Sequence, residues 1–252
     1  MTLAEIPKME PTRRLRDVLV SAGAWIRGYS LFIPVGIAIL LLSRWMPPQR
    51  FFPLVQWSCR LMLRTMGIRV TVEGRQAAPR NRACLFMCNH VNLFDVFVLS
   101  GYMPGHFRGV ELDEHFDWFF YGPIIRALGM IPISQTNGRS ALKSLVAARE
   151  AIDQGTSVVI LPEGGRTPDG RFQPFKRGAF LLAKRADVPV VPMAMAGAYE
   201  INRRGSLMVR PGRMVLRFGQ PIDRLEIARQ ETDTLQRQIR SRMLALFNGQ
   251  AV

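Results

Sequence analysis

The chain has 252 residues, enough for one large α/β domain with a full core plus a short additional element, but too few for two independent domains of that kind. Lysine and arginine total 34 against 19 aspartate and glutamate, so the net charge of +15 predicts attraction to a polyanion such as anionic lipid or an acidic carrier. The charge is spread along the chain and no nucleic-acid-binding motif accompanies it, which argues against nucleic acid as a partner.

Cysteine and histidine are scarce in this sequence. Cys59, Cys84 and Cys88 form an odd set without metal-ligand spacing and without the pattern of a secreted disulfide scaffold, so we expect reduced thiols in a protein that faces the cytosol. The chain has three histidines, which form no compact cluster of ligands with other residues. The sequence therefore predicts no metal site.

Two apolar segments follow a polar N-terminal arm. Residues 28–43 carry no charge, and this length is just below the roughly 20 residues that span a bilayer core. A Pro47-Pro48 turn leads to the second segment, residues 51–66. Because basic residues flank both ends of the first segment, the positive-inside rule favours no single crossing. We predict that residues 1–67 form an arm and a membrane-associating two-helix segment that enters one leaflet and returns. The alternatives are a transmembrane helix and a buried helical hairpin.

Residues 68–252 alternate short apolar runs with amphipathic segments, which predicts an α/β sandwich with a mixed sheet. The expected strands are 69–72 at a sheet edge, 83–88 at the centre, 107–112, 130–133, 157–161 and 188–195. The expected helices are 94–101, 116–128, 140–153, 176–185 and 224–247. A turn at Pro211-Gly212 predicts a hairpin between strands 206–210 and 214–218.

The sequence Asn-His-Val-Asn-Leu-Phe-Asp, residues 89–95, directly follows the predicted central strand. In open α/β sheets, ligands bind at the carboxyl ends of the strands. On one continuous helix, His90 and Asp95 would point about 140° apart, so we expect His90 in a loop and Asp95 in the first turn of the next helix. There the carboxylate can bind one ring nitrogen, leaving the other to accept a proton from a substrate hydroxyl. An ordinary loop pair explains the same residues.

A second motif, Pro-Glu-Gly-Gly-Arg-Thr at residues 162–167, follows the predicted strand 157–161. Gly164 and Gly165 allow a sharp turn and a close approach of the backbone to a ligand. Arg166 offers several N–H donors in a geometry that suits a phosphate. A plain turn closed by a Glu163–Arg166 pair is the alternative.

Taken together and in this order, the two motifs resemble the glycerolipid acyltransferase family typified by 1-acyl-glycerol-3-phosphate acyltransferase. The family's first block, Asn-His-x4-Asp, matches Asn89, His90 and Asp95. Its third block, Pro-Glu-Gly-Thr-Arg, matches residues 162–166, with Gly165 at the usual threonine. The sequences Phe-Lys-Arg-Gly-Ala from residue 175 and Val-Pro-Val-Val-Pro from residue 188 resemble downstream blocks, so the resemblance covers about residues 69–220.

The family's second block fits less well. Members often carry a lysine before a Glu-Leu pair. Here the basic residue, Arg108, stands at a different spacing from that pair. Gln135 stands where arginine is common after an apolar Gly-x-Ile-x-Ile run. Those basic positions are expected to hold a substrate phosphate, so the resemblance supports acyl transfer more strongly than it supports a particular acceptor.

The resemblance implies a membrane-associated O-acyltransferase, at the cytoplasmic face of what is expected to be a bacterial inner membrane. It would move a fatty acyl group from acyl-CoA or acyl carrier protein to the free hydroxyl of a lysophospholipid, foremost 1-acyl-glycerol-3-phosphate, giving phosphatidic acid. His90, oriented by Asp95, would be the general base, and no cofactor is needed beyond the acyl donor. The expected substrate-binding residues are Glu163, Gly164, Gly165 and Arg166.

Other interpretations stay open at this point. The acceptor could be another lysolipid, such as a lyso-ornithine lipid that has no phosphate. In a different class, the chain could be a non-catalytic, membrane-anchored lipid-binding protein. The aromatic stretch at residues 117–121 either shapes an acyl tunnel or packs in the core.

Overall fold

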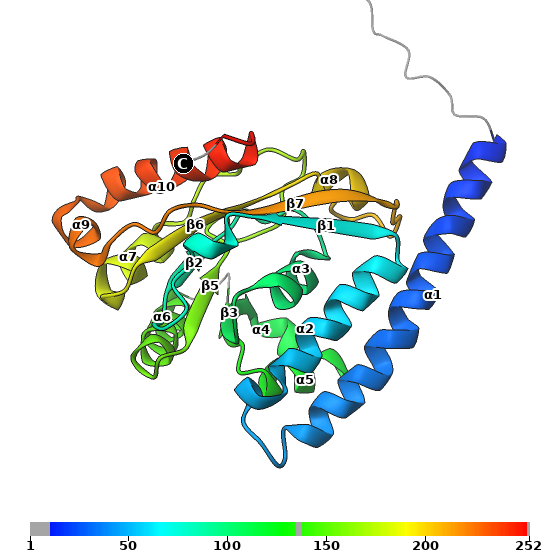
Figure 1. Ribbon diagram of the computed structural model, residues 1–252, viewed down its shortest axis with the longest axis horizontal. Helices are drawn as coiled ribbons and strands as arrows, with labels where there is room; N and C mark the ends of the chain where they lie inside the picture. The colour runs from blue at the N-terminus through cyan, green and yellow to red at the C-terminus, as the bar shows by residue number, and fades with distance from the viewer. Residues whose placement is uncertain (1–10, 135–137, 251–252) are drawn as a thin grey trace, which may run out of the picture.

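The computed structural model describes residues 11–134 and 138–250. Within these residues, seven strands form one sheet in the order β1-β7-β6-β2-β5-β3-β4 (Figure 1). β6 and β7 are antiparallel, and the other neighbouring pairs are parallel, so the predicted mixed sheet is confirmed. The strands are β1 (Ile68–Glu73), β2 (Leu85–Met87), β3 (Phe107–Leu112), β4 (Ile131–Ile133), β5 (Ser157–Ile160), β6 (Val190–Ala196) and β7 (Gly212–Phe218).

Helices cover both faces of this sheet (Figure 1). They are α1 (Pro11–Leu42), α2 (Pro48–Thr65), α3 (Asp95–Tyr102), α4 (Asp113–Phe116), α5 (Tyr121–Ala127), α6 (Gly138–Asp153), α7 (Arg177–Ala186), α8 (Ala198–Ile201), α9 (Arg224–Arg229) and α10 (Thr232–Phe247), with a short 3₁₀ turn at Arg75–Ala77. Phe86 of β2 packs in the core on the side of α1, α2, α3 and α5. Leu85 and Met87 pack on the opposite side, against α6, α7 and α10. β2 is therefore buried on both faces, as predicted for the central strand.

α1 is longer than the predicted apolar segment because Arg27 does not end it. The Arg27 Nε donates a 2.7 Å hydrogen bond to the Thr65 carbonyl oxygen at the end of α2, so this charge is accommodated between the two helices. The segment Leu15–Leu42 is long and apolar enough to cross a membrane, judged by length and composition alone. Large apolar side chains along α1 are exposed to solvent: Leu15, Val18, Leu19, Ile26, Tyr29, Ile33, Ile37 and Leu41. The predicted N-terminal arm, at residues 1–10, lies outside the described residues.

The predicted hairpin between residues 206–210 and 214–218 was wrong. β7 pairs with β1 in parallel and with β6 in antiparallel orientation, and residues 206–210 form no strand. Residues 202–210, here termed the 202–210 loop, are closed at the base by a 2.9 Å hydrogen bond from Arg210 N to Ile201 O. The buried Asn202 amide donates to the carbonyl oxygens of Ser206 and Met208, at 2.8 and 3.1 Å. These bonds satisfy backbone groups that a hairpin would have paired.

Two predicted helices are each divided. The predicted helix 116–128 is interrupted near its start: α4 ends at Phe116 and α5 begins at Tyr121, and the chain between them turns so closely that a Cβ at Gly122 would lie 2.0 Å from the Phe116 carbonyl oxygen. The predicted helix 224–247 becomes α9 and α10, separated by extended backbone at Gln230 and Glu231. Asp223 begins α9 by accepting a hydrogen bond from Leu225 N.

Candidate active site

His90 and Asp95 meet at the carboxyl end of β2, in the arrangement predicted from their spacing. His90 lies in the loop after β2, and α3 begins at Asp95. The His90 Nδ1 is 2.8 Å from the Asp95 Oδ2. The His90 side chain is 25% exposed and the Asp95 side chain 1%. Among the described residues the His90 Nε2 has no hydrogen-bond partner, so this nitrogen is available to a ligand.

The Asp95 carboxylate also fixes the backbone of the His90 loop. Its Oδ2 accepts hydrogen bonds from Val91 N and Asn92 N in addition to the imidazole. Both donors lie in the loop that precedes α3. One oxygen atom therefore sets both the orientation of the ring and the path of the chain that carries it.

Glu163 joins the second motif to the first through backbone groups. Its Oε1 accepts a 3.0 Å hydrogen bond from His90 N, and its Oε2 accepts a 2.8 Å bond from Gln173 N. The side chain is buried, and burial raises the pKa of the Glu163 carboxyl, while the N–H groups of Gln173 and His90 oppose that rise. Thr167 N donates back to His90 O at 2.9 Å. The two motifs, 73 residues apart, thus form one hydrogen-bonded unit.

The Gly164-Gly165-Arg166 turn faces solvent beside this unit. Gly164 has φ +68°, a conformation that favours glycine, and its N–H donates to Leu161 O within the turn, so this N–H is not offered to a ligand. A Cβ at Gly165 would meet nothing within 4 Å, so the position has room for the threonine that is usual there. No hydrogen bond to the Gly165 N–H or to the Arg166 guanidinium is found in the part of the chain that the structure describes. Both are free to bind a substrate.

Two asparagines of the first motif have structural roles that the sequence analysis did not assign. The Asn89 side chain donates from Nδ2 to Met195 O at 3.0 Å and accepts from Met195 N at 2.7 Å, which ties the loop to β6. Asn92 donates to Ala198 O at 2.7 Å and accepts from Phe94 N at 2.9 Å, forming an Asx turn before α3. The latter was detectable, because asparagine shortly before a helix is a common turn signal.

The basic residue of the second block does not reach this site. Arg108 lies in the first half of β3, and its Nε donates to Gly129 O at 2.6 Å. This guanidinium therefore braces the end of α5 against β3, towards the amino ends of the strands. Gln135 lies outside the described residues.

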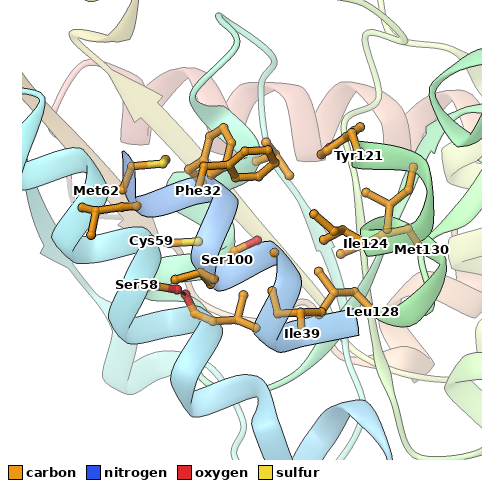
Figure 2. A pocket seen from close by; sticks show the side chains of 17 residues that line it. Phe32, Ile39, Ser58, Cys59, Met62, Ser100, Tyr121, Ile124, Leu128 and Met130 are labelled. Carbon is orange, nitrogen blue, oxygen red and sulfur yellow. Dashed lines mark hydrogen bonds between the residues drawn. The ribbon is translucent and has the colours of Figure 1, made fainter. Parts of the chain in front are cut away.

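An apolar pocket opens between α1, α2, α3 and α5, and Figure 2 shows the side chains that line it. Phe32 and Ile39 of α1 and Ile124 of α5 contribute to its wall. Val96 and Phe97 of α3 also line the pocket, and they follow Asp95 directly in the chain. The helix that carries Asp95 thus also contributes to the wall of the pocket.

The side chains of the aromatic stretch at residues 117–121 lie in different environments. Tyr121 lines the pocket, and Phe120 packs edge-on against Phe32 of α1 with ring centroids 5.6 Å apart. Trp118 is half-exposed and packs against the rings of His115 and Tyr121, whereas Phe119 is 97% exposed. Neither core packing nor pocket formation accounts for that exposed ring.

Solved structures and known sequences resemble this chain. The crystal structure of the 1-acyl-sn-glycerophosphate (LPA) acyltransferase PlsC from Thermotoga maritima superposes with a TM-score of 0.81, at 20% identity, covering 94% of this chain and 98% of that one. This likeness shows the fold. A 1-acyl-sn-glycerol-3-phosphate acyltransferase from Cocos nucifera is 29% identical over 164 residues, which are 65% of this chain and 53% of the relative. One from Helicobacter pylori is 32% identical over 120 residues, 47% of this chain and 51% of the relative.

The chain spans about half the length of these two relatives. The family model described as Acyltransferase matches residues 69–196, which are half of the chain and include both motifs of the site. On this match, and with the fold it shares with PlsC, the chain belongs to the Acyltransferase family.

Proposed function

We propose that the protein is an O-acyltransferase that moves a fatty acyl group from an acyl thioester to the free hydroxyl of a lysophospholipid. The observation that carries this proposal is the His90–Asp95 pair, with the imidazole Nδ1 held at 2.8 Å and Nε2 free, joined by backbone hydrogen bonds to the Arg166 turn. A thioester is already activated, so the reaction needs mainly a base, a site for the developing oxyanion, and alignment of two amphiphiles.

In this mechanism, the His90 Nε2 removes the proton from the acceptor hydroxyl as its oxygen attacks the thioester carbonyl carbon. Asp95 holds the ring tautomer and stabilises the imidazolium that forms. The C–S bond then breaks, and His90 returns the proton to the departing thiolate, which leaves an ester and a free thiol. Such acid–base assistance contributes about a hundredfold to ten-thousandfold in rate.

Arg166 is proposed to bind a phosphate of the acceptor or donor, and the free N–H of Gly165 is available beside it. Glu163 is proposed to orient the site by positioning the His90 loop, since both its oxygens accept backbone N–H groups. Gly164 shapes the turn through its positive φ. Arg166 and His90 would then contact the substrate, and the Glu163 carboxylate would hold the two motifs in position.

The apolar pocket is proposed to hold part of an acyl chain, since its wall is apolar and includes Val96 and Phe97 of α3, the helix that begins at Asp95. Residues 1–67 would form the arm and anchor, and residues 68–252 the catalytic domain. The exposed apolar side chains along α1 support membrane association, and we propose entry into one leaflet from the cytoplasmic face. Acyl-CoA and acyl carrier protein are both anionic donors that suit the net charge of +15.

The proposal is tested by product analysis after incubation with acyl thioester and a mixture of lysolipids. We expect 1-acyl-glycerol-3-phosphate to be converted to phosphatidic acid. Conversion of a phosphate-free lysolipid alone, such as lyso-ornithine lipid, would retain acyl transfer and replace the acceptor. Absence of any acylated product with both donors would leave the non-catalytic lipid-binding alternative.

A further inference from the structure

The 202–210 loop brings a second guanidinium to the Arg166 turn. Arg204 Nη1 donates a 3.1 Å hydrogen bond to the Arg166 carbonyl oxygen. The loop and α8 are braced against the same turn, because the Tyr199 hydroxyl donates to Pro168 O at 3.0 Å. Two arginine side chains, 38 residues apart in sequence, are thus attached to one turn at the edge of the site.

The positive charge at this position is not neutralised within the described residues. Neither the Arg166 nor the Arg204 guanidinium forms an ion pair there. Glu163 accepts backbone N–H groups on both oxygens, and Asp169 accepts hydrogen bonds from Thr167 Oγ1 and Arg171 N. The carboxylates nearest in sequence to the turn are therefore engaged elsewhere, and an anionic ligand can supply the missing countercharge.

The neighbouring Arg203 provides a contrast. Its Nη2 lies 3.4 Å from Glu200 Oε2, and its guanidinium stacks over the Tyr199 ring at 5.1 Å. Both arginines are exposed and belong to the same loop. Arg203 therefore has its partners on α8, whereas Arg204 is bonded to the Arg166 turn.

The loop that carries Arg204 is also attached to the apolar helix α1. Trp25 Nε1 donates a 2.7 Å hydrogen bond to Leu207 O, and Val209 N donates to Ser21 Oγ at 2.9 Å. Leu207 is 81% exposed, and large apolar side chains along α1 are exposed as well. The loop therefore connects an exposed apolar surface to the arginine turn. A lipid in a membrane presents chemical groups in the same order, from an apolar acyl chain to an anionic headgroup phosphate.

We propose that Arg204 is a second ligand for the phosphate of the acceptor lysolipid, acting together with Arg166. The inference rests on the proposed acyl transfer and adds a residue to its substrate site. Binding of the phosphate between two guanidinium groups would fix the acceptor headgroup beside His90. Because Arg204 is anchored to the Arg166 backbone and the loop is internally bonded, little of the loop has to be ordered on binding.

The test compares Arg204→Gln with Arg203→Gln, using 1-acyl-glycerol-3-phosphate in mixed micelles and varying acceptor and acyl donor separately. We expect Arg204→Gln to raise the acceptor KM about tenfold, with the donor KM and kcat within about threefold of wild type. Arg203→Gln should leave all three constants within about twofold. Thermal unfolding of both variants checks the fold. If Arg204→Gln unfolds, the Arg204→Lys and Arg203→Lys pair is compared, and Arg204→Lys alone should raise the acceptor KM severalfold.

Acceptor constants that are equal in the two members of a pair would overturn the assignment of Arg204, as would an effect confined to the donor KM. Neither result affects acyl transfer by the wild-type protein, which is measured in the same assay. A wild-type enzyme that acylates lyso-ornithine lipid and not 1-acyl-glycerol-3-phosphate would also remove the role of Arg204 while retaining the reaction.

Discussion

The two loops of the site are held in opposite ways. The His90 loop is fixed through buried groups, since Asp95 holds the ring and Glu163 and Thr167 bind the His90 backbone. The Arg166 turn instead presents partly or fully exposed cations with free N–H donors. Proton transfer needs a base held within hydrogen-bond reach of the hydroxyl, whereas long arginine side chains can close on a phosphate after it arrives. We therefore expect changes in the first loop to act on kcat or stability, and changes in the second to act on KM.

Replacement of His90 by alanine gives the largest expected effect. His90→Ala should lower kcat at least a hundredfold, because the proposed base is lost. The fold should be retained, since Asp95 still accepts from Val91 N and Asn92 N. Steady-state assay together with thermal unfolding measures both. Added imidazole should restore part of the turnover, and near-normal acyl transfer without it would remove the general-base role.

Replacement of Asn89 tests whether the first loop depends on its buried hydrogen bonds. Asn89→Ala leaves the Met195 N–H and C=O without their side-chain partners in the core, and such groups cost about 1–3 kcal/mol each when unpaired. We expect the free energy of unfolding to fall by about 2–4 kcal/mol in denaturant titrations. Asn81→Ala, at an exposed position, is the matched control and should change it by less than about 0.5 kcal/mol. Equal losses in the two variants would contradict the structural role of Asn89.

Replacement of Arg166 by lysine tests the second loop. An ammonium group keeps the charge but cannot form the paired N–H contacts of a guanidinium with phosphate. Arg166→Lys should therefore raise the acceptor KM by about tenfold while kcat changes little. An unchanged KM would show that this arginine is structural, and the comparison between the loops would then fail.

The first loop was more predictable from the sequence than the second. The five-residue spacing of His90 and Asp95, set after an apolar run, was sufficient to predict a loop, a helix start and a side-chain hydrogen bond, all of which the structure contains. The hydrogen bonds that join the two motifs were not predictable, because they use His90 N and Thr167 N. These are backbone groups, which carry no residue-specific signal.

The position of Arg204 beside the Arg166 turn could not be predicted from the sequence, for a related reason. The Pro211-Gly212 pair indicated a hairpin, but β7 pairs with β1 and β6. Asn202 closes the preceding residues into a loop, and strand partners that lie about 20 or 140 residues away cannot be predicted from a local turn signal. A similar limit applied to α1, whose extent depends on a bond between Arg27 and the end of α2.

The smallest expected effect is the pH dependence of stability that comes from Glu163, whose carboxyl links the two loops. Burial raises the pKa of Glu163 above 4.5, its ordinary value, so the folded protein binds this proton more tightly than the unfolded chain does. The contribution of Glu163 to stability is therefore greatest below pH 4.5, falls as pH rises through the folded pKa, and is constant above it. Glu163→Gln removes this titration but keeps one of the two acceptors. The measurement is urea titration at a series of pH values starting at 4.5. As pH rises, the free energy of unfolding of wild type should fall relative to that of Glu163→Gln, and the difference should then stay constant. The control Glu231→Gln, at an exposed position, should follow wild type at every pH. A difference between wild type and Glu163→Gln that is the same at every pH would show that titration of Glu163 does not affect stability.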